Sequence, residues 1–106
     1  MDPSKRLEED AVKAFNEIGL EGKPTKASGQ VRGDGDAIGS DLFTAECKYK
    51  STEGFSVSRK DFNKACDQAH THGRQPVFFV RNKYNETIVC MRLEDWIHHM
   101  QQALDN

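Results

Sequence analysis

The feature that most constrains the fold is an unbroken apolar run that follows Pro76, Val77-Phe78-Phe79-Val80. A strand with one face in solvent alternates apolar and polar residues, whereas a strand covered on both faces reads as a continuous apolar run. The run therefore predicts a strand inside a sheet that has packing layers on both sides. In α/β proteins helices supply those layers.

Three segments carry apolar residues at helical spacing and can form such layers. The first follows Asp2, a helix-capping residue that precedes a proline, and is expected to end at Gly19. The second is expected to begin after Ser58 and to stop at Gly73, and the third is an amphipathic pattern over 93–104.

Shorter segments between these helices have the pattern of strands. Gly39-Ser40-Asp41 is typical of a hairpin turn, and residues 42–49 after it alternate with period two. A further strand is expected at Thr87–Met91, and a short edge strand around Thr25–Val31. The order predicts an α/β fold in a single domain over residues 1–106, with a mixed central sheet of about four to five strands flanked by three helices.

Composition excludes several classes of function. No apolar run approaches the ~20 residues that a membrane span needs, and the N-terminus leads into acidic residues, so we expect a cytoplasmic protein with no membrane partner. Three cysteines, Cys47, Cys66 and Cys90, each lie within an apolar pattern, which favours reduced thiols. The absence of a P-loop, a Gly-x-Gly-x-x-Gly and a Cys-x-x-Cys leaves a nucleotide cofactor and structural zinc without support.

Net charge by itself argues against a nucleic-acid partner. The formal charge is −2, whereas nucleic-acid-binding domains are usually basic. The charge is unevenly distributed, however, because bases outnumber acids over residues 23–92 while both ends of the chain are acidic. The basic middle segment of the chain can therefore still bind a polyanion such as a nucleic acid.

Charged residues stand in the segment that should form a central strand. Glu46 and Lys48 are two apart and so point to the same face, and Asp36 lies on the facing arm of the expected hairpin. Buried charges are costly unless they are paired or bound to metal. Two carboxylates plus water suit Mg²⁺, which can activate water against a phosphodiester, and a lysine can orient that water. A surface salt bridge on an edge strand is the alternative, and Asp34 and Asp41 are near enough in sequence to assist Asp36.

In this context the chain resembles the PD-(D/E)XK nucleases, and most closely the small archaeal and phage-type Holliday-junction resolvases. The segments that carry the resemblance span nearly the whole chain: Lys5-Arg6-Leu7-Glu8, Ala27-Ser28-Gly29, Gly35-Asp36, Phe43-Thr44-Ala45-Glu46-Cys47-Lys48, Gly73-Arg74-Gln75-Pro76-Val77 and Met91-Arg92-Leu93-Glu94-Asp95. The resemblance implies a restriction-endonuclease-like core, a homodimer, branched DNA as substrate, and Mg²⁺ as cofactor, with Mn²⁺ able to substitute. Gly35 stands where the motif's name has proline.

The resemblance also implies roles for individual residues. Asp36 and Glu46 match the metal-binding carboxylates, and the backbone carbonyl of Cys47 matches a further metal ligand. Lys48 matches the catalytic lysine, and Glu8 matches a glutamate on the first helix near the metal. These assignments predict a catalytic set of Glu8, Asp36, Glu46 and Lys48.

Basic and polar residues near this motif are candidates for contact with DNA. Lys26 and Ser28 match a basic residue and a serine that touch the DNA backbone, although both also suit an ordinary solvated loop. Lys50, Arg59 and Lys60 follow the motif strand and can track phosphates, whereas a solvated helix face explains Lys60 nearly as well.

Together these patterns predict a Mg²⁺-dependent, structure-selective endodeoxyribonuclease that resolves four-way junctions in DNA recombination and repair, in a prokaryotic or phage-infected cell. Paired cuts need two active centres, which a homodimer supplies. Core packing or dimer packing is expected of Trp96 and Phe62. Two alternatives remain open: a nicking, restriction-like or repair endonuclease of the same superfamily, and a non-catalytic DNA-binding module of the same fold.

Overall fold

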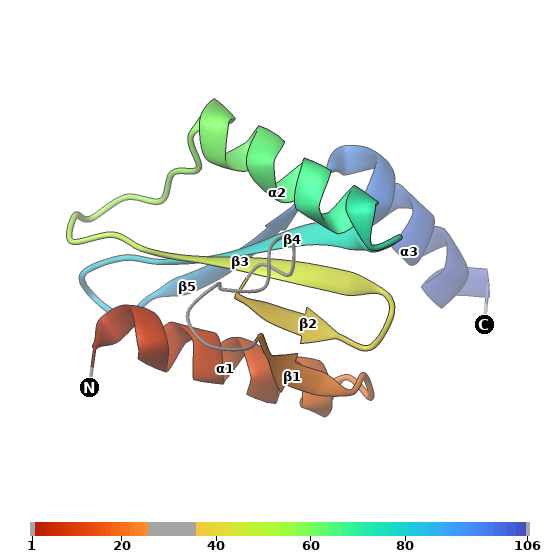
Figure 1. The fold of residues 1–106 in the computed structure, drawn as a ribbon, viewed down its shortest axis with the longest axis horizontal. Coiled ribbons are helices and arrows are strands. Elements are labelled where there is room, and N and C mark those ends of the chain that lie inside the picture. Colours follow the sequence, from red (N-terminus) through yellow and green to blue (C-terminus); the bar gives the residue numbers. More distant parts are fainter. Residues whose placement is uncertain (1, 26–35, 106) are drawn as a thin grey trace.

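A computed structural model of the chain describes residues 2–25 and 36–105. Within these ranges a five-stranded mixed sheet lies between helices (Figure 1). The elements run in the order α1 (Pro3–Glu17), β1 (Gly22–Pro24), β2 (Ala37–Gly39), β3 (Phe43–Tyr49), α2 (Arg59–Thr71), β4 (Gln75–Arg81), β5 (Thr87–Met91) and α3 (Leu93–Asp105). The predicted α/β class, mixed sheet and three helices are confirmed.

The strands are ordered β1-β2-β3-β4-β5, so β3 is the middle strand of the sheet. Neighbouring strands are antiparallel except β3 and β4, which are parallel and are joined through α2. The β3–β4 register pairs Glu46 with Phe78 and Lys48 with Val80. The charged pair predicted from sequence therefore lies in the centre of the sheet and not at an edge.

Capping residues fix the ends of α1 and α2 where the sequence predicts them. The Asp2 carboxylate accepts a hydrogen bond from the backbone N–H of Ser4 at 2.9 Å, and the Ser58 hydroxyl accepts one from the N–H of Asp61 at 3.1 Å. Gly19 and Gly73 follow the two helices with φ of +89° and +68°, a backbone conformation that favours glycine.

The edge strand begins earlier than predicted. β1 starts at Gly22, three residues before the expected Thr25, and the greater part of the expected range lies outside the described residues. The β2–β3 turn explains the position, because Ser40 N–H donates to the Glu21 carbonyl and Glu21 N–H donates to the Ser40 hydroxyl. These two bonds align the chain after α1 with β2.

The sheet has a buried core on each face. The α1 face is made of Leu7, Ala11, Phe15, Ala37, Phe43, Ala45, Cys47, Val77 and Phe79, and the α2 face of Ala65, Phe78 and Val80. Phe15 stacks on Phe43 at a centroid distance of 5.9 Å and meets Phe79 edge-on at 5.6 Å. The apolar run of β4 thus supplies side chains to both cores, as its pattern predicts.

The apolar stripe of α3 remains largely exposed, which excludes the core-packing alternative for Trp96. Leu93 is 70% exposed, Trp96 51% and Leu104 84%. Among described residues, His99 links α3 to the sheet through the ring of Phe43, at 5.2 Å, and through the side chain of Gln75. None of the helices in the described part of the chain has the length and apolar character to span a membrane.

Candidate active site

Asp36 lies immediately before β2 and beside the middle of β3. Its N–H donates to the Ala45 carbonyl at 2.9 Å, and its Oδ2 accepts from the N–H of Cys47 at 2.9 Å. Ala45 is the register partner of Ala37, so this backbone bond lies one residue out of the β2–β3 register. The Asp36 carboxylate, in place of a backbone carbonyl, accepts the next N–H on this side of β3. The carboxylate is therefore held where β2 ends and β3 continues.

Glu46 is half-buried on β3 between the two residues that anchor Asp36. Burial raises the pKa of Glu46 to about 7, with the Asp36 carboxylate as the second cause, while Lys48 opposes the change. Two carboxylates of like charge thus share one region of low polarity. A bound cation would relieve their repulsion.

Cys47 contributes through its backbone and not through its thiol. In a strand the N–H and C=O of one residue point to the same side, and the Cys47 N–H points at Asp36. The Cys47 carbonyl therefore points toward the same edge, beyond the last β2–β3 pair, Ala37 with Ala45. The thiol is buried in the α1-side core, and burial raises its pKa. Cys47, Cys66 and Cys90 are all free thiols, as the composition predicts.

Glu8 approaches this region from α1. Leu7 and Ala11 are buried against the sheet, which leaves Glu8 half-buried at the flank of the helix and Glu9 exposed. The pKa of Glu8 is raised, first by burial and then by the charge of Asp36. The predicted acids Glu8, Asp36 and Glu46 are therefore electrostatic neighbours, with Asp36 between the other two.

Two further acids were candidates to assist Asp36. Asp41 is exposed in the β2–β3 turn, which is at the opposite end of β2 from Asp36, so the fold separates it from the site. Asp34 lies outside the described residues. Of the described candidates, only Asp36 reaches Glu46.

Lys48 extends toward α2, where it meets a residue that the sequence did not identify as part of the site. Its Nζ lies 3.4 Å from Oδ2 of Asp61, and both side chains are about one-third exposed. Lys48 is the first cause that lowers the pKa of Asp61, and a hydrogen bond with Ser58 is the second. Asp61 was recognised only as a helix-start residue. Its distance of thirteen residues from Lys48 leaves no local signal of the contact.

The donor set is small, which bears on the metal it could hold. In the described part of the chain, no three or more His, Cys, Asp or Glu side chains are arranged to bind one metal ion. A closed zinc site is therefore not formed by these residues. Mg²⁺ retains several waters and needs only one or two carboxylates, so Asp36, Glu46 and the Cys47 carbonyl fit this cation.

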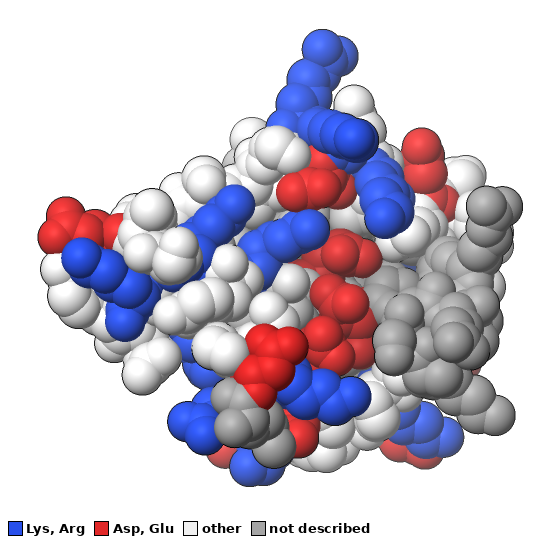
Figure 2. All heavy atoms as spheres, turned by 60° about the vertical axis from the view of Figure 1, so that its left-hand side comes forward, with Lys and Arg blue, Asp and Glu red and all other residues white. Residues whose placement is uncertain are grey.

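Candidate DNA-contacting residues lie on the same side as Lys48. Arg59 and Lys60 are exposed in the first turn of α2, and Lys50 is half-buried just after β3, where its N–H donates to the Arg81 carbonyl at 2.7 Å. Figure 2 shows acidic side chains gathered in a column on one face of the molecule, with Lys and Arg above it and to its left. Lys26 and Ser28 lie outside the described residues.

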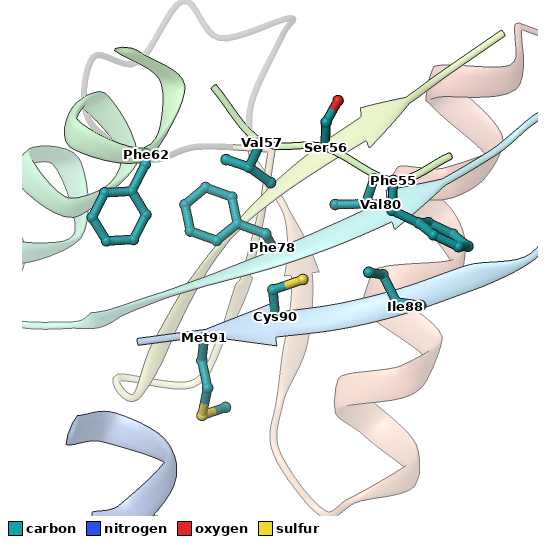
Figure 3. Close-up of a pocket in the computed structure, with 9 residues that line it drawn as sticks. All are labelled: Phe55, Ser56, Val57, Phe62, Phe78, Val80, Ile88, Cys90 and Met91. Atoms are coloured by element: carbon teal, nitrogen blue, oxygen red, sulfur yellow. The ribbon is translucent and has the colours of Figure 1, made fainter. Parts of the chain in front are cut away.

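An apolar pocket of about 220 Å³ lies on the α2 face of β4 and β5 (Figure 3). Its lining comprises Phe55, Ser56, Val57, Phe62, Phe78, Val80, Ile88, Cys90 and Met91. Burial raises the pKa of Cys90, so its thiol is a weak nucleophile. The pocket therefore offers packing surface and no acid–base chemistry, and the carboxylates beside β2 remain the candidate active site.

Comparisons with family models, curated proteins and solved structures give no match to this chain. The resemblance to PD-(D/E)XK nucleases therefore stays a prediction that rests on the sequence motifs.

Proposed function

We propose that the protein is a Mg²⁺-dependent, structure-selective endodeoxyribonuclease that resolves four-way DNA junctions by paired hydrolysis of phosphodiesters. The observation that carries the proposal lies where Asp36, just before β2, meets the middle of β3. There the Asp36 carboxylate accepts a hydrogen bond from the Cys47 N–H. Burial and then the Asp36 charge raise the pKa of the neighbouring Glu46, and Lys48 follows two residues after Glu46 on the same strand. Oxygen donors beside an ammonium group match what hydrolysis of a phosphodiester requires.

Each group has a distinct task in this reaction. Mg²⁺, when bound by Asp36, Glu46 and the Cys47 carbonyl, would supply Lewis-acid stabilisation of the scissile phosphate and acidify a water molecule. Lys48 would donate hydrogen bonds to the attacking water or to a phosphate oxygen. Glu8, half-buried and close to the charge of Asp36, would accept a hydrogen bond from water on the α1 side. The central β3 strand supports this set because its backbone is held by ladders on both sides.

Charge separation supports a polyanionic substrate despite the net charge of −2. Cation binding would neutralise the central carboxylates, and Lys50, Arg59 and Lys60 would then face DNA phosphates. Contacts of this kind recognise the shape of the DNA backbone and do not distinguish one base sequence from another. Branch geometry is therefore the expected source of selectivity.

A homodimer is part of the proposal, and the surface around α3 is the expected interface. An apolar groove of about 620 Å³ runs between α1, the sheet and α3, and its lining includes Ile18, Val89 and Met100. Beside it the α3 stripe exposes Leu93, Trp96, Ile97 and Leu104. Taking ~200 Å² for a fully exposed large side chain, the four α3 residues expose roughly 500 Å². With Ile18, Val89 and Met100 the total is roughly 800 Å², the area that each partner buries in a standard interface.

A second copy of the chain is the occupant that this surface fits. An apolar ridge and an apolar groove lie side by side on one protomer, so a two-fold axis can place each ridge in the partner's groove. Leu42 and Phe43 line the groove at the start of β3, whereas Glu46 and Lys48 lie nearer the C-terminal end of that strand. Dimerisation there would leave both active sites accessible to DNA.

The test compares cleavage of a four-way junction with that of linear duplex, nicked and flap DNA of matched sequence, in Mg²⁺ and in EDTA. Symmetric paired nicks confined to the junction are expected. Cleavage of the other substrates at equal rates would instead indicate a repair or restriction-like endonuclease. Absence of cleavage on every substrate, with DNA binding retained, would indicate a non-catalytic module.

Variants connect the activity to the proposed site. Lys48→Ala is expected to abolish cleavage and to retain junction binding. Lys13→Ala is the matched control, since Lys13 is exposed on α1 and should leave cleavage unchanged. Cleavage by Lys48→Ala at the wild-type rate would contradict the assignment of the site.

A further inference from the structure

The Lys48 ammonium has two carboxylates within its reach. Glu46 lies two residues earlier on the same face of β3, and Asp61 faces it from the first turn of α2. Within residues 2–25 and 36–105, Lys48 forms its ion pair with Asp61, at 3.4 Å, and not with Glu46. The Lys48 ammonium is therefore held on the α2 side of the site, in an ion pair with a residue that is not a proposed metal ligand.

The first turn of α2 fixes the backbone of Asp61 opposite Lys48. Its N–H donates to the hydroxyl of Ser58, the residue that caps α2, and its carboxylate lies at the positive end of the helix dipole. The helix is itself anchored on the sheet through Ala65 and Ala69, which are both fully buried. The packing of α2 thus fixes the backbone of Asp61, and its carboxylate reaches Lys48 from that position.

We propose that Asp61 is a positioning residue that holds the Lys48 ammonium on the α2 side of the site and so leaves the Glu46 carboxylate free to bind a divalent cation. This inference rests on the proposed nuclease function. Without Asp61, the nearest anionic partner of Lys48 is Glu46. An ion pair between those two would compete with the cation for the same carboxylate oxygens, and it would place the ammonium where the metal should be.

Metal affinity tests this role without any requirement for cleavage. Calorimetric titration of the full chain with Mn²⁺ alone should show about five-fold weaker binding for Asp61→Asn, a coupling within the range found for contacting charged groups. In a Lys48→Met background the same substitution should change the affinity by less than about two-fold. Equal weakening in both backgrounds would overturn the proposal, because Asp61 would then act only as a nearby negative charge.

Two further variants separate positioning from helix stability. Asp61→Glu keeps a carboxylate in the first turn of α2, so it should restore at least half of the lost Mn²⁺ affinity. Asp67→Asn removes an exposed carboxylate farther along the same helix and should leave the affinity unchanged. Failure of Asp61→Glu to restore the affinity would also count against the proposal.

A spectroscopic readout distinguishes failure of this inference from failure of the proposed function. In metal-free protein at pH 8, Asp61→Asn should shift the ¹³C resonance of the Glu46 carboxyl group, and should not do so in the Lys48→Met background. An unchanged resonance would overturn the positioning role even if the protein cleaves junctions. If the wild-type chain neither binds Mn²⁺ nor cleaves DNA, the nuclease proposal fails, and the metal-site role of Asp61 fails with it, while the resonance still reports whether Asp61 holds Lys48.

Discussion

Replacing Glu46 with Gln should make the metal-free protein more stable while it abolishes the proposed activity. Glu46 is half-buried beside Asp36, and its pKa is raised to about 7 from the ordinary value of 4.5, first by burial and then by the Asp36 charge. At pH 8 the folded chain must therefore hold an unfavourable carboxylate. Gln has nearly the same shape and no charge, so it removes this cost and leaves the backbone of β3 in place.

The size of the effect follows from the same pKa. A rise from 4.5 to about 7 corresponds to an upper bound of about 3 kcal/mol for a fully buried group. Glu46 is partly open to solvent, and screening reduces the expected gain to about 1–2 kcal/mol. Because the folded-state pKa is raised, wild-type stability falls relative to Glu46→Gln as pH rises from 4.5 to 7. The difference should be absent below pH 4.5 and constant above pH 7.

Urea unfolding followed by circular dichroism, in EDTA at pH 4.5, 6 and 8, measures this difference. Glu17→Gln, at the exposed end of α1, is the control for removal of an ordinary acidic charge and should change stability little. Saturating Mg²⁺ at pH 8 should stabilise the wild-type protein and leave Glu46→Gln unchanged. Equal or lower stability of Glu46→Gln at pH 8 without metal would refute the reasoning.

Three other predictions concern packing, assembly and DNA binding. Gly39→Ala should destabilise the fold by about 1–3 kcal/mol, because the added Cβ would lie 2.8 Å from Cδ1 of Phe15. Gly54→Ala has open space around the added Cβ and should change stability by less than about 0.5 kcal/mol. Thermal unfolding of the two variants measures the difference. Trp96→Ser combined with Ile97→Ser should convert a dimer into a folded monomer in sedimentation analysis, and a wild-type chain that is monomeric at micromolar concentration would remove α3 as the interface. Arg59→Ala and Lys60→Ala should each lower the slope of log affinity against log salt by about 0.9 for junction DNA, and unchanged slopes would show that the start of α2 does not contact phosphate.

The sequence predicted the elements well because their signals are local. A capping residue, a left-handed glycine or an apolar run acts within a few residues, and so the ends of α1 and α2 and the burial of β4 were all confirmed. The edge strand was placed too late because its position depends on Ser40, nineteen residues away, which pairs with Glu21. Pairing across that separation leaves no periodic pattern in either segment.

Among the candidate site residues, too, some could be placed from local patterns and others only from the packing of separate elements. The period-two pattern of β3 was enough to put Glu46 and Lys48 on one face. Glu8 was chosen through the resemblance, and the structure places it half-buried at the flank of α1. Two other points could be seen only in the tertiary structure. Asp36, and not Asp41, lies beside Glu46, and Lys48 forms an ion pair with Asp61. Both depend on how separate elements pack.

By itself, therefore, the sequence determined where the three helices and strands β3, β4 and β5 lie, that Glu46 and Lys48 share one face of β3, and which residue types could perform hydrolysis. Only the tertiary structure decided which charges meet, because Coulomb interactions depend on distance in space and not along the chain. It also decided that the apolar stripe of α3 lies outside the core. Amphipathic spacing predicts that one face of a helix will be buried. It does not distinguish burial against the chain's own sheet from burial against a partner.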